Sequence, residues 1–169
     1  MKRICVIGNS GGGKSTLARR IAAREQLPYF EIDAFLWLPG WKVAPAETYD
    51  RELTRILASD AWVLDGVGTT PSIAPRLERA TDIVLVDLPL WVHFWLAADR
   101  QTAWALGKID HPPAGMQVRP PTEGLFRNMW MIDQELMPII RKMVEIEEAR
   151  GKKVARITSL EELEASYAT

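Results

Sequence analysis

The residues with the clearest chemistry are 8–15, which read Gly-Asn-Ser-Gly-Gly-Gly-Lys-Ser. They fit the phosphate-binding loop pattern G-x-x-x-x-G-K-[S/T] at every position. The apolar residues 4–7 before the loop predict a buried strand, and residues 16–25 place apolar side chains at helical spacing. A glycine-rich loop between a strand and a helix directs several backbone N–H groups into one concavity, beside the positive end of the helix dipole. The sequence therefore predicts a nucleotide phosphate site.

Within this loop, Lys14 is expected to reach the β- and γ-phosphates and Ser15 to bind Mg²⁺ through its hydroxyl. The alternative is a glycine-rich turn that contains Lys-Ser by chance. The predicted strand before the loop and the predicted helix after it argue against this alternative. The residues predicted to bind the nucleotide are Gly8, Asn9, Ser10, Gly11, Gly12, Gly13, Lys14, Ser15 and Thr16.

Composition excludes several classes of protein. The 169 residues suit one domain, and a net charge of -1 provides no general basic field for nucleic acid or anionic membranes. The single cysteine, Cys5, excludes a disulfide framework. The first residues do not resemble a signal peptide, and no apolar run reaches the length of a membrane span. We expect a cytoplasmic protein with neither membrane nor nucleic-acid partners; its oligomeric state is left open.

Short strands alternate with helices along the chain. Strands are expected at 4–7, 27–33, 61–65, 82–87 and 153–157, and helices at 16–25, 46–59, 72–79, 90–106, 122–149 and 159–164, with a disturbance at Pro138. This order predicts a three-layer α/β/α P-loop fold, with a five-stranded parallel sheet covered by helices on both faces. Residues 1–169 would form one domain, with a short lid-like segment around 107–121.

Three aspartates end predicted strands. Ligands of parallel sheets bind at the carboxyl ends of the strands, so Asp33, Asp65 and Asp87 should share one edge with the loop. Asp87 is the candidate metal ligand, and Asp33 is placed on the acceptor side, in catalysis and substrate binding. Asp65 and Gly66 could shape the acceptor pocket. For each aspartate the alternative is an acid that only stabilises a turn.

Seven tryptophans are many for this length. Trp37 and Trp41 flank a Pro-Gly turn just after Asp33, where large rings could wall a substrate pocket. Trp62 lies in a predicted strand and is expected in the core. Trp91 and Trp95 share one face of a predicted helix, so we expect them to pack inside the protein.

Basic residues near the lid-like segment could stabilise the charge of a transferring phosphoryl group. Arg100 and Arg119 are the predicted catalytic cations, and Lys108 and Arg127 are further candidates; a solvated surface position is the alternative for each. The two histidines, His93 and His111, have no metal-ligand spacing or evident partner, and we interpret both as structural or exposed.

Four segments together resemble the adenylate kinase-like proteins known as DNA topology modulation proteins: GNSGGGKST, YFEIDAFLWLPGW, WVLDG and DIVLVDLP. The resemblance extends over nearly the whole chain and implies a nucleoside-monophosphate-kinase-type fold that uses ATP and Mg²⁺, with a lid closing over the phosphates. Two positions depart from the family pattern. Val67-Gly68 replaces the usual Asn-Tyr, and Arg100 is almost alone on a helix that usually carries several arginines. The absence of a basic patch gives the DNA-related name no support.

The leading hypothesis is an ATP-dependent phosphotransferase, similar to nucleoside and nucleotide kinases, that acts on an unidentified small acceptor. The alternative is a non-catalytic nucleotide-binding module that regulates a partner. A nucleic-acid-associated protein is a third and weaker hypothesis, which salt-dependent DNA binding would reveal.

Overall fold

A five-stranded sheet forms the centre of the protein. The computed structural model describes residues 1–109, 112, 116 and 118–168. The strands are β1 (Lys2–Gly8), β2 (Tyr29–Glu31), β5 (Ala61–Asp65), β6 (Asp82–Val86) and β7 (Lys153–Ile157). They lie in the order β2-β5-β1-β6-β7, and every neighbouring pair is parallel. The predicted five-stranded parallel sheet is confirmed.

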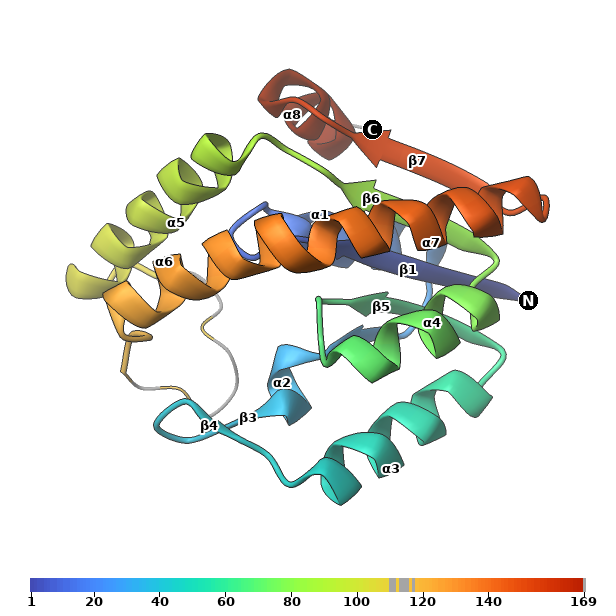
Figure 1. Cartoon of the computed structure of the whole chain (residues 1–169), viewed down its shortest axis with the longest axis horizontal. Coiled ribbons are helices and arrows are strands. Elements are labelled where there is room, and N and C mark those ends of the chain that lie inside the picture. The colour runs from blue at the N-terminus through green and yellow to red at the C-terminus, as the bar shows by residue number, and fades with distance from the viewer. Residues whose placement is uncertain (110–111, 113–115, 117, 169) are drawn as a thin grey trace.

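Helices cover both faces of this sheet, as Figure 1 shows. Their bounds are α1 (Lys14–Glu25), α2 (Asp33–Leu36), α3 (Ala46–Ala58), α4 (Thr70–Arg79), α5 (Leu90–Ala105), α6 (Thr122–Met131), α7 (Met137–Ala149) and α8 (Leu160–Ala168). One apolar core joins the sheet to α2, α3, α4 and α7, and a second joins it to α1, α8 and the beginning of α5. This is the predicted three-layer α/β/α arrangement.

The alternation of side chains along β1 explains why two cores form. Cys5 and Ile7 belong to the core under α3, α4 and α7, whereas Ile4 and Val6 belong to the core under α1. Successive side chains of a strand point to opposite faces, so a continuous apolar run suits a strand that is covered twice. Trp62 is fully buried, as predicted.

Two segments differ in detail from the sequence prediction. The aromatic stretch after β2 forms α2 and then a small hairpin, β3 (Trp37–Leu38) and β4 (Lys42–Val43). The single helix expected over 122–149 is divided by η1, a π-helical turn at Ile132–Leu136. This turn ends two residues before Pro138, which has no N–H to donate and whose ring would clash with the preceding turn of a regular helix.

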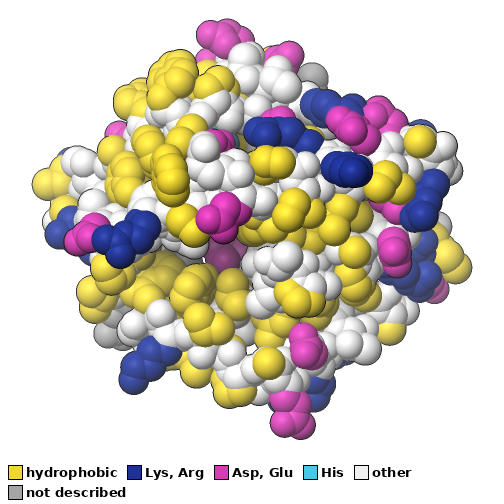
Figure 2. Space-filling model, in the orientation of Figure 1, with side chains coloured by type: hydrophobic (Ala, Val, Ile, Leu, Met, Phe, Trp, Pro, Cys, Tyr) yellow, Lys and Arg dark blue, Asp and Glu magenta, His cyan; other side chains and the backbone are white. Residues whose placement is uncertain are grey.

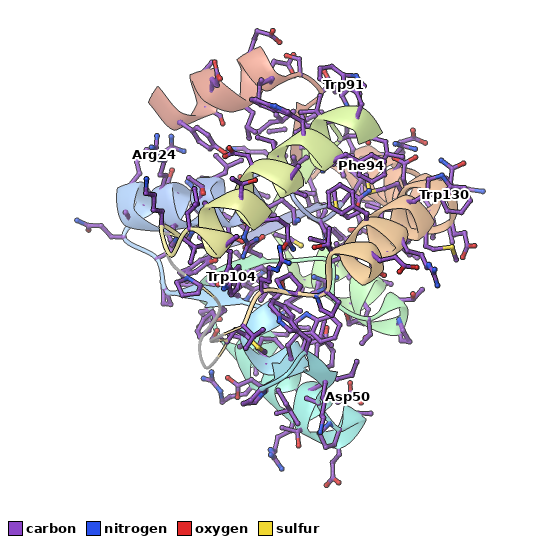
Figure 3. All side chains as sticks on the ribbon, turned by 90° about the vertical axis from the view of Figure 1, so that its left-hand side faces the viewer. Arg24, Asp50, Trp91, Phe94, Trp104 and Trp130 are labelled. Atoms are coloured by element: carbon purple, nitrogen blue, oxygen red, sulfur yellow. The ribbon has the colours of Figure 1, made fainter. Side chains whose placement is uncertain are left out.

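The tryptophans of α5 are not in the core. Trp91 and Trp95 are 68% and 55% exposed, so the prediction that they pack inside is wrong. The buried face of α5 carries Val92, His93 and Ala97, which turns the two indoles outward. Figure 2 shows hydrophobic side chains gathered over α5, and Figure 3 shows Trp91 on α5 and Trp130 on α6. Within the described residues, no helix has the length and apolar character to cross a membrane.

Candidate phosphate-binding and phosphoryl-transfer site

The glycine-rich loop connects β1 to α1 at the carboxyl edge of the sheet. A Cβ at Gly8 would lie 2.1 Å from the backbone oxygen of Val86 on β6, and Gly11 and Gly13 have φ angles of 74° and 72°. Residues with a Cβ rarely adopt such conformations, so the glycines are required for this path of the chain. Helix α1 begins at Lys14, whose buried side chain donates a hydrogen bond of 2.7 Å from Nζ to the backbone oxygen of Asn9.

Three elements hold the loop from outside. Asn9 donates from Nδ2 to the backbone oxygen of Met129 on α6, at 2.8 Å. The ring of His93 on α5 places Nδ1 2.9 Å from the backbone oxygen of Ser10. The hydroxyl of Tyr167 on α8 donates to the backbone oxygen of Gly13 at 3.3 Å. The phosphate-binding loop is therefore fixed by contacts with distant parts of the chain.

Asp65 lies beside the loop, at the carboxyl end of β5. It is only 1% exposed, and Tyr29 donates a hydrogen bond to its Oδ2 at 3.2 Å. Its Oδ1 is buried and has no hydrogen-bond partner among the described residues. Burial raises the pKa of Asp65, while the positive charge of Lys14 and the nearby Ser15 hydroxyl lower it. A buried carboxylate beside a phosphate-binding loop, close to the hydroxyl of Ser15, suits a bound cation.

Lys14 is a cation surrounded by several acidic side chains. Burial lowers its pKa, and the negative charges of Asp65, Asp33 and Glu31 raise it. The structure thus brings Asp33 and Asp65 to the loop, at the edge where the sequence places them. Glu31 was missed; it lies opposite Asp65 in the β2–β5 register, and burial raises its pKa, as do Asp65 and Asp33. Its position two residues before Asp33, at a strand end, was the available signal.

Asp87 follows β6, but another residue engages its carboxylate. Arg141 on α7 donates from Nε and from an NH2 nitrogen to the two oxygens of Asp87, both at 2.8 Å. Charge-assisted bidentate pairs of this kind are strong and geometrically specific. The metal-binding role of Asp87 stays a prediction, and here its carboxylate is held by an arginine 54 residues away in sequence.

The predicted acceptor-side loop after β5 is shaped by Arg76. This side chain is fully buried on α4, and it donates to the backbone oxygens of Gly66 at 2.7 Å and Ser72 at 3.0 Å, and to that of Val67. Gly66 has a φ of 129°, and a Cβ there would lie 2.9 Å from Cβ of Ile32. Gly66 therefore allows the chain after β5 to pass close to Ile32.

The predicted aromatic wall extends onto α5. The ring centres of Trp37 and Trp41 are 6.0 Å apart, and those of Trp41 and Trp104 are 6.1 Å apart. Trp41 also donates from Nε1 to the backbone oxygen of Val118 at 2.8 Å. The guanidinium of Arg100 lies 6.0 Å from the centre of the Trp104 ring, and its charge lowers the pKa of Lys14. Trp37, Trp41 and Arg100 are thus brought to one region.

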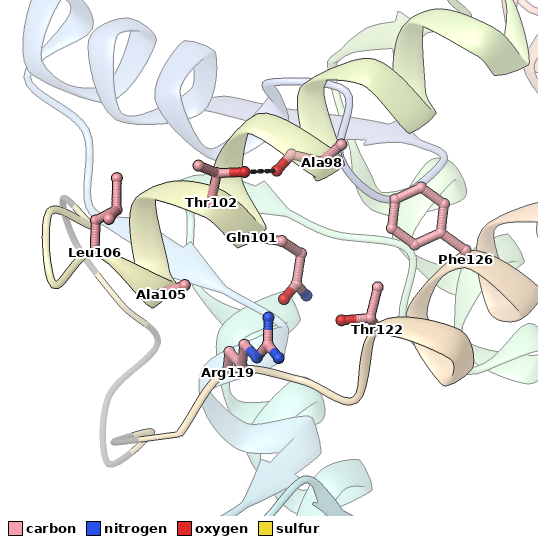
Figure 4. A pocket seen from close by; sticks show the side chains of 8 residues that line it. All are labelled: Ala98, Gln101, Thr102, Ala105, Leu106, Arg119, Thr122 and Phe126. Carbon is pink, nitrogen blue, oxygen red and sulfur yellow. Dashed lines mark hydrogen bonds between the residues drawn. The ribbon is translucent and has the colours of Figure 1, made fainter.

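The other predicted lid cations are placed differently. Arg119 lines a cleft of about 340 Å³ between α5 and the beginning of α6, together with Gln101 and Phe126 (Figure 4). Arg127 is exposed and pairs with Glu123 of its own helix at 2.5 Å. Lys108 follows α5, and His111 lies outside the described residues.

His93 has a partner that the sequence did not reveal. Its interpretation as structural or exposed assumed none, and it is in fact buried against the loop. Its pKa is lowered to about 4, first by burial and second by the charge of Lys14, whereas the backbone oxygen of Ser10 and the charges of Asp133 and Asp87 raise it. The imidazole is therefore neutral at pH 7.

This lowered pKa predicts a pH dependence of stability. Between pH 6.5 and about 4, the unfolded chain binds a proton at His93 that the folded protein does not bind. The free energy of unfolding should therefore fall as the pH decreases through this range, by about 3 kcal/mol in total. Urea unfolding of the wild type and of the His93→Asn variant at several pH values measures this contribution. Equal slopes for the two proteins would contradict it.

The sheet order, the glycine-rich loop and the flanking helices define a P-loop kinase fold of the nucleoside-monophosphate-kinase-like class. Among solved structures, the chain is similar to shikimate kinase from Acinetobacter baumannii in complex with shikimate, with a TM-score of 0.56 and 17% identity over 99% of this chain and 90% of that one. It is also similar to shikimate kinase from Bacteroides thetaiotaomicron, with a TM-score of 0.51 and 16% identity over 99% and 94%. Identities this low show the fold alone.

The chain matches no protein-family model, and it matches no curated protein. The resemblance to the DNA topology modulation proteins is therefore not confirmed.

Proposed function

We propose that this protein is an ATP-dependent phosphotransferase that transfers the γ-phosphate of ATP to a small acceptor. One observation carries the proposal: a buried Lys14 at the beginning of α1 lies among the charges of Asp65, Asp33 and Glu31. In such a site, the cation of the phosphate-binding loop stabilises phosphate charge, and a carboxylate at the same sheet edge can accept a proton. The fold supports this proposal, since the two solved structures compared above are named as shikimate kinases.

The donor half of the site would be formed by residues 8–16. Backbone N–H groups of the loop and the Lys14 ammonium would hold the phosphates. The residues present fit Mg²⁺, because the unpartnered Oδ1 of Asp65 is buried beside the loop and the Ser15 hydroxyl acts on the same carboxylate. Ser15 and Asp65 would hold the ion. Asp87 is the metal ligand that the sequence predicts, and its carboxylate is paired with Arg141. Mg²⁺ would neutralise phosphate charge when bound.

The acceptor half would be formed by residues that follow β2 and β5. Asp33 would accept the proton of an acceptor hydroxyl, as a carboxylate within reach of the reacting group can do. Trp37, Trp41 and Gly66 would line the acceptor pocket, and Arg100 and Arg119 would stabilise the transferring charge. The chemical identity of the acceptor is not defined by these residues.

The experiment is a measurement of ATP consumption with Mg²⁺ against a panel of acceptors. The panel contains nucleoside monophosphates, nucleosides, sugars, and small hydroxy acids including shikimate, with an assay lacking any acceptor as the background. The proposal expects one class of acceptor to raise turnover well above that background. Binding of ATP without acceptor-dependent turnover anywhere on the panel would contradict a kinase.

Exposed tryptophans support a second candidate function, that of a nucleotide-binding regulatory module. Trp91 and Trp95 on α5 and Trp130 on α6 are exposed, while His93 of α5 contacts the phosphate-binding loop. Exposed apolar side chains of this size can form a contact surface for a partner. Nucleotide-dependent association that the Trp91→Ser variant abolishes, without acceptor-dependent turnover, would favour this function. Multiple-turnover transfer by a monomer would exclude it.

A further inference from the structure

His93 makes a hydrogen bond that fixes one peptide group of the loop. The side chain is 1% exposed, and its Nδ1 lies 2.9 Å from the backbone oxygen of Ser10. A carbonyl oxygen can only accept, so Nδ1 carries the proton and donates it. The C=O and N–H groups of a trans peptide unit point in opposite directions. Holding the Ser10 carbonyl toward α5 therefore directs the N–H of Gly11 away from α5.

The same side chain packs against the next part of the loop. A Cβ at Gly12 would lie 2.6 Å from Cε1 of His93 and 2.9 Å from its Nδ1. A Cβ at Gly11 would lie 2.9 Å from the backbone oxygen of His93 and 3.2 Å from Cβ of Ala97. Helix α5 thus approaches the two glycines so closely that the ring and the helix backbone together limit where the loop can move.

One face of α5 continues from the loop to the aromatic residues. His93, Ala97, Arg100 and Trp104 follow one another at helical spacing, so they lie on one side of the helix. Arg100 acts electrostatically on Lys14, and Trp104 packs against Trp41. A shift of α5 would therefore displace the loop through His93 and the aromatic residues through Trp104.

We propose that His93 is a positioning residue, which orients the peptide groups of Ser10–Gly12 so that the Gly11 N–H faces the phosphates of a bound nucleotide. The inference rests on the proposed function of the loop. His93 itself lies on the outer side of the loop and acts through it. Its removal should weaken nucleotide binding more than it changes the rate of transfer once nucleotide is bound.

The test compares ATP binding, measured by calorimetry with Mg²⁺, in the wild type and three variants. His93→Leu removes the donor, whereas His93→Asn places a side-chain N–H near the position of Nδ1. Thr102→Val is the matched control, because it removes a side-chain bond to a backbone oxygen, that of Ala98, on the same helix. We expect His93→Leu to bind ATP about tenfold more weakly, and His93→Asn and Thr102→Val to bind within about threefold of the wild type. The KM for ATP should rise with the same order, while kcat at saturating ATP changes less.

Equal ATP affinity of His93→Leu and the wild type would overturn the inference, as would a His93→Asn variant no better than His93→Leu. If the leucine variant does not fold, His93→Gln replaces it, because the glutamine nitrogen corresponds to Nε2 and does not reach Ser10; it should show the same loss. A wild type that binds no ATP would instead contradict the proposed function, and the inference with it. The two failures are distinguishable, because one appears in the wild type and the other only in the difference between variants.

Discussion

Replacing Lys14 with methionine is expected to lower acceptor-dependent ATP turnover by about 10²–10³-fold, the usual effect of removing one charge that stabilises a transition state. Methionine has a similar length and no charge, so the change removes the ammonium and retains much of the volume. The side chain is buried, and its ammonium lies in the field of Asp65, Asp33 and Glu31. A cation from the solvent that took the place of the ammonium would have to lose its hydration, which costs a large free energy.

The matched control is Lys142→Met, an exposed lysine on α7. It should leave turnover unchanged, and circular dichroism should show both variants folded. The measurement is the initial rate at saturating ATP with the best acceptor from the panel. If the Lys14→Met variant kept more than about a tenth of wild-type turnover, Lys14 would not have the expected role in stabilising the transferring phosphoryl group.

The second large effect is expected from Arg76→Met, which should lower the free energy of unfolding by about 3 kcal/mol, as removal of one partner of a buried charged interaction commonly does. The Arg76 guanidinium donates to the backbone oxygens of Gly66, Val67 and Ser72. Methionine donates to none of them, so buried carbonyl groups would lose their charged partner. The loop after β5 should also become less ordered, because the backbone oxygens of Gly66 and Val67 belong to this loop.

Arg79→Met provides the comparison. Arg79 lies on the same helix, is exposed, and donates from Nε to the backbone oxygen of Leu57 at 2.9 Å. The expected loss there is about 0–1 kcal/mol, because exposed interactions contribute little. Urea unfolding of the three proteins measures both values. Similar losses for the two arginines would show that burial of Arg76 does not set its contribution.

Local patterns were sufficient for the sheet and the donor loop. The strands around Ile4, Trp62 and Ile83 are recognisable because a parallel strand covered on both faces is apolar along its length. The loop is recognisable because its glycines and Lys14 have fixed spacing. The common edge of Asp33 and Asp65 followed from topology, since parallel strands end at the same edge.

Contacts between distant residues could not be predicted in this way. The bond between His93 and Ser10 spans 83 residues, and the pair of Arg141 and Asp87 spans 54. Neither partner carries a local signal, because a histidine or an arginine on a helix has the same pattern whether it faces a loop or water. For the same reason, spacing alone misplaced Trp91: it indicates that side chains share a face, but not whether that face is buried.

The π-helical turn between α6 and α7 sets the rotational phase of the two helices. Each residue of an α-helix advances the side-chain direction by roughly 100°. The buried residue Met129 lies near the end of α6, the buried residue Ile132 begins η1, and Met137 and Ile140 follow η1. Ile132 and Met137 are therefore five positions apart, where a regular helix would place buried residues three or four positions apart. The additional residue lets α7 bury its apolar side against the sheet while the backbone oxygen of Met129 still meets Asn9. Deleting one residue of this turn would rotate one helix against the other, and the phosphate-binding loop would lose its contact with α6.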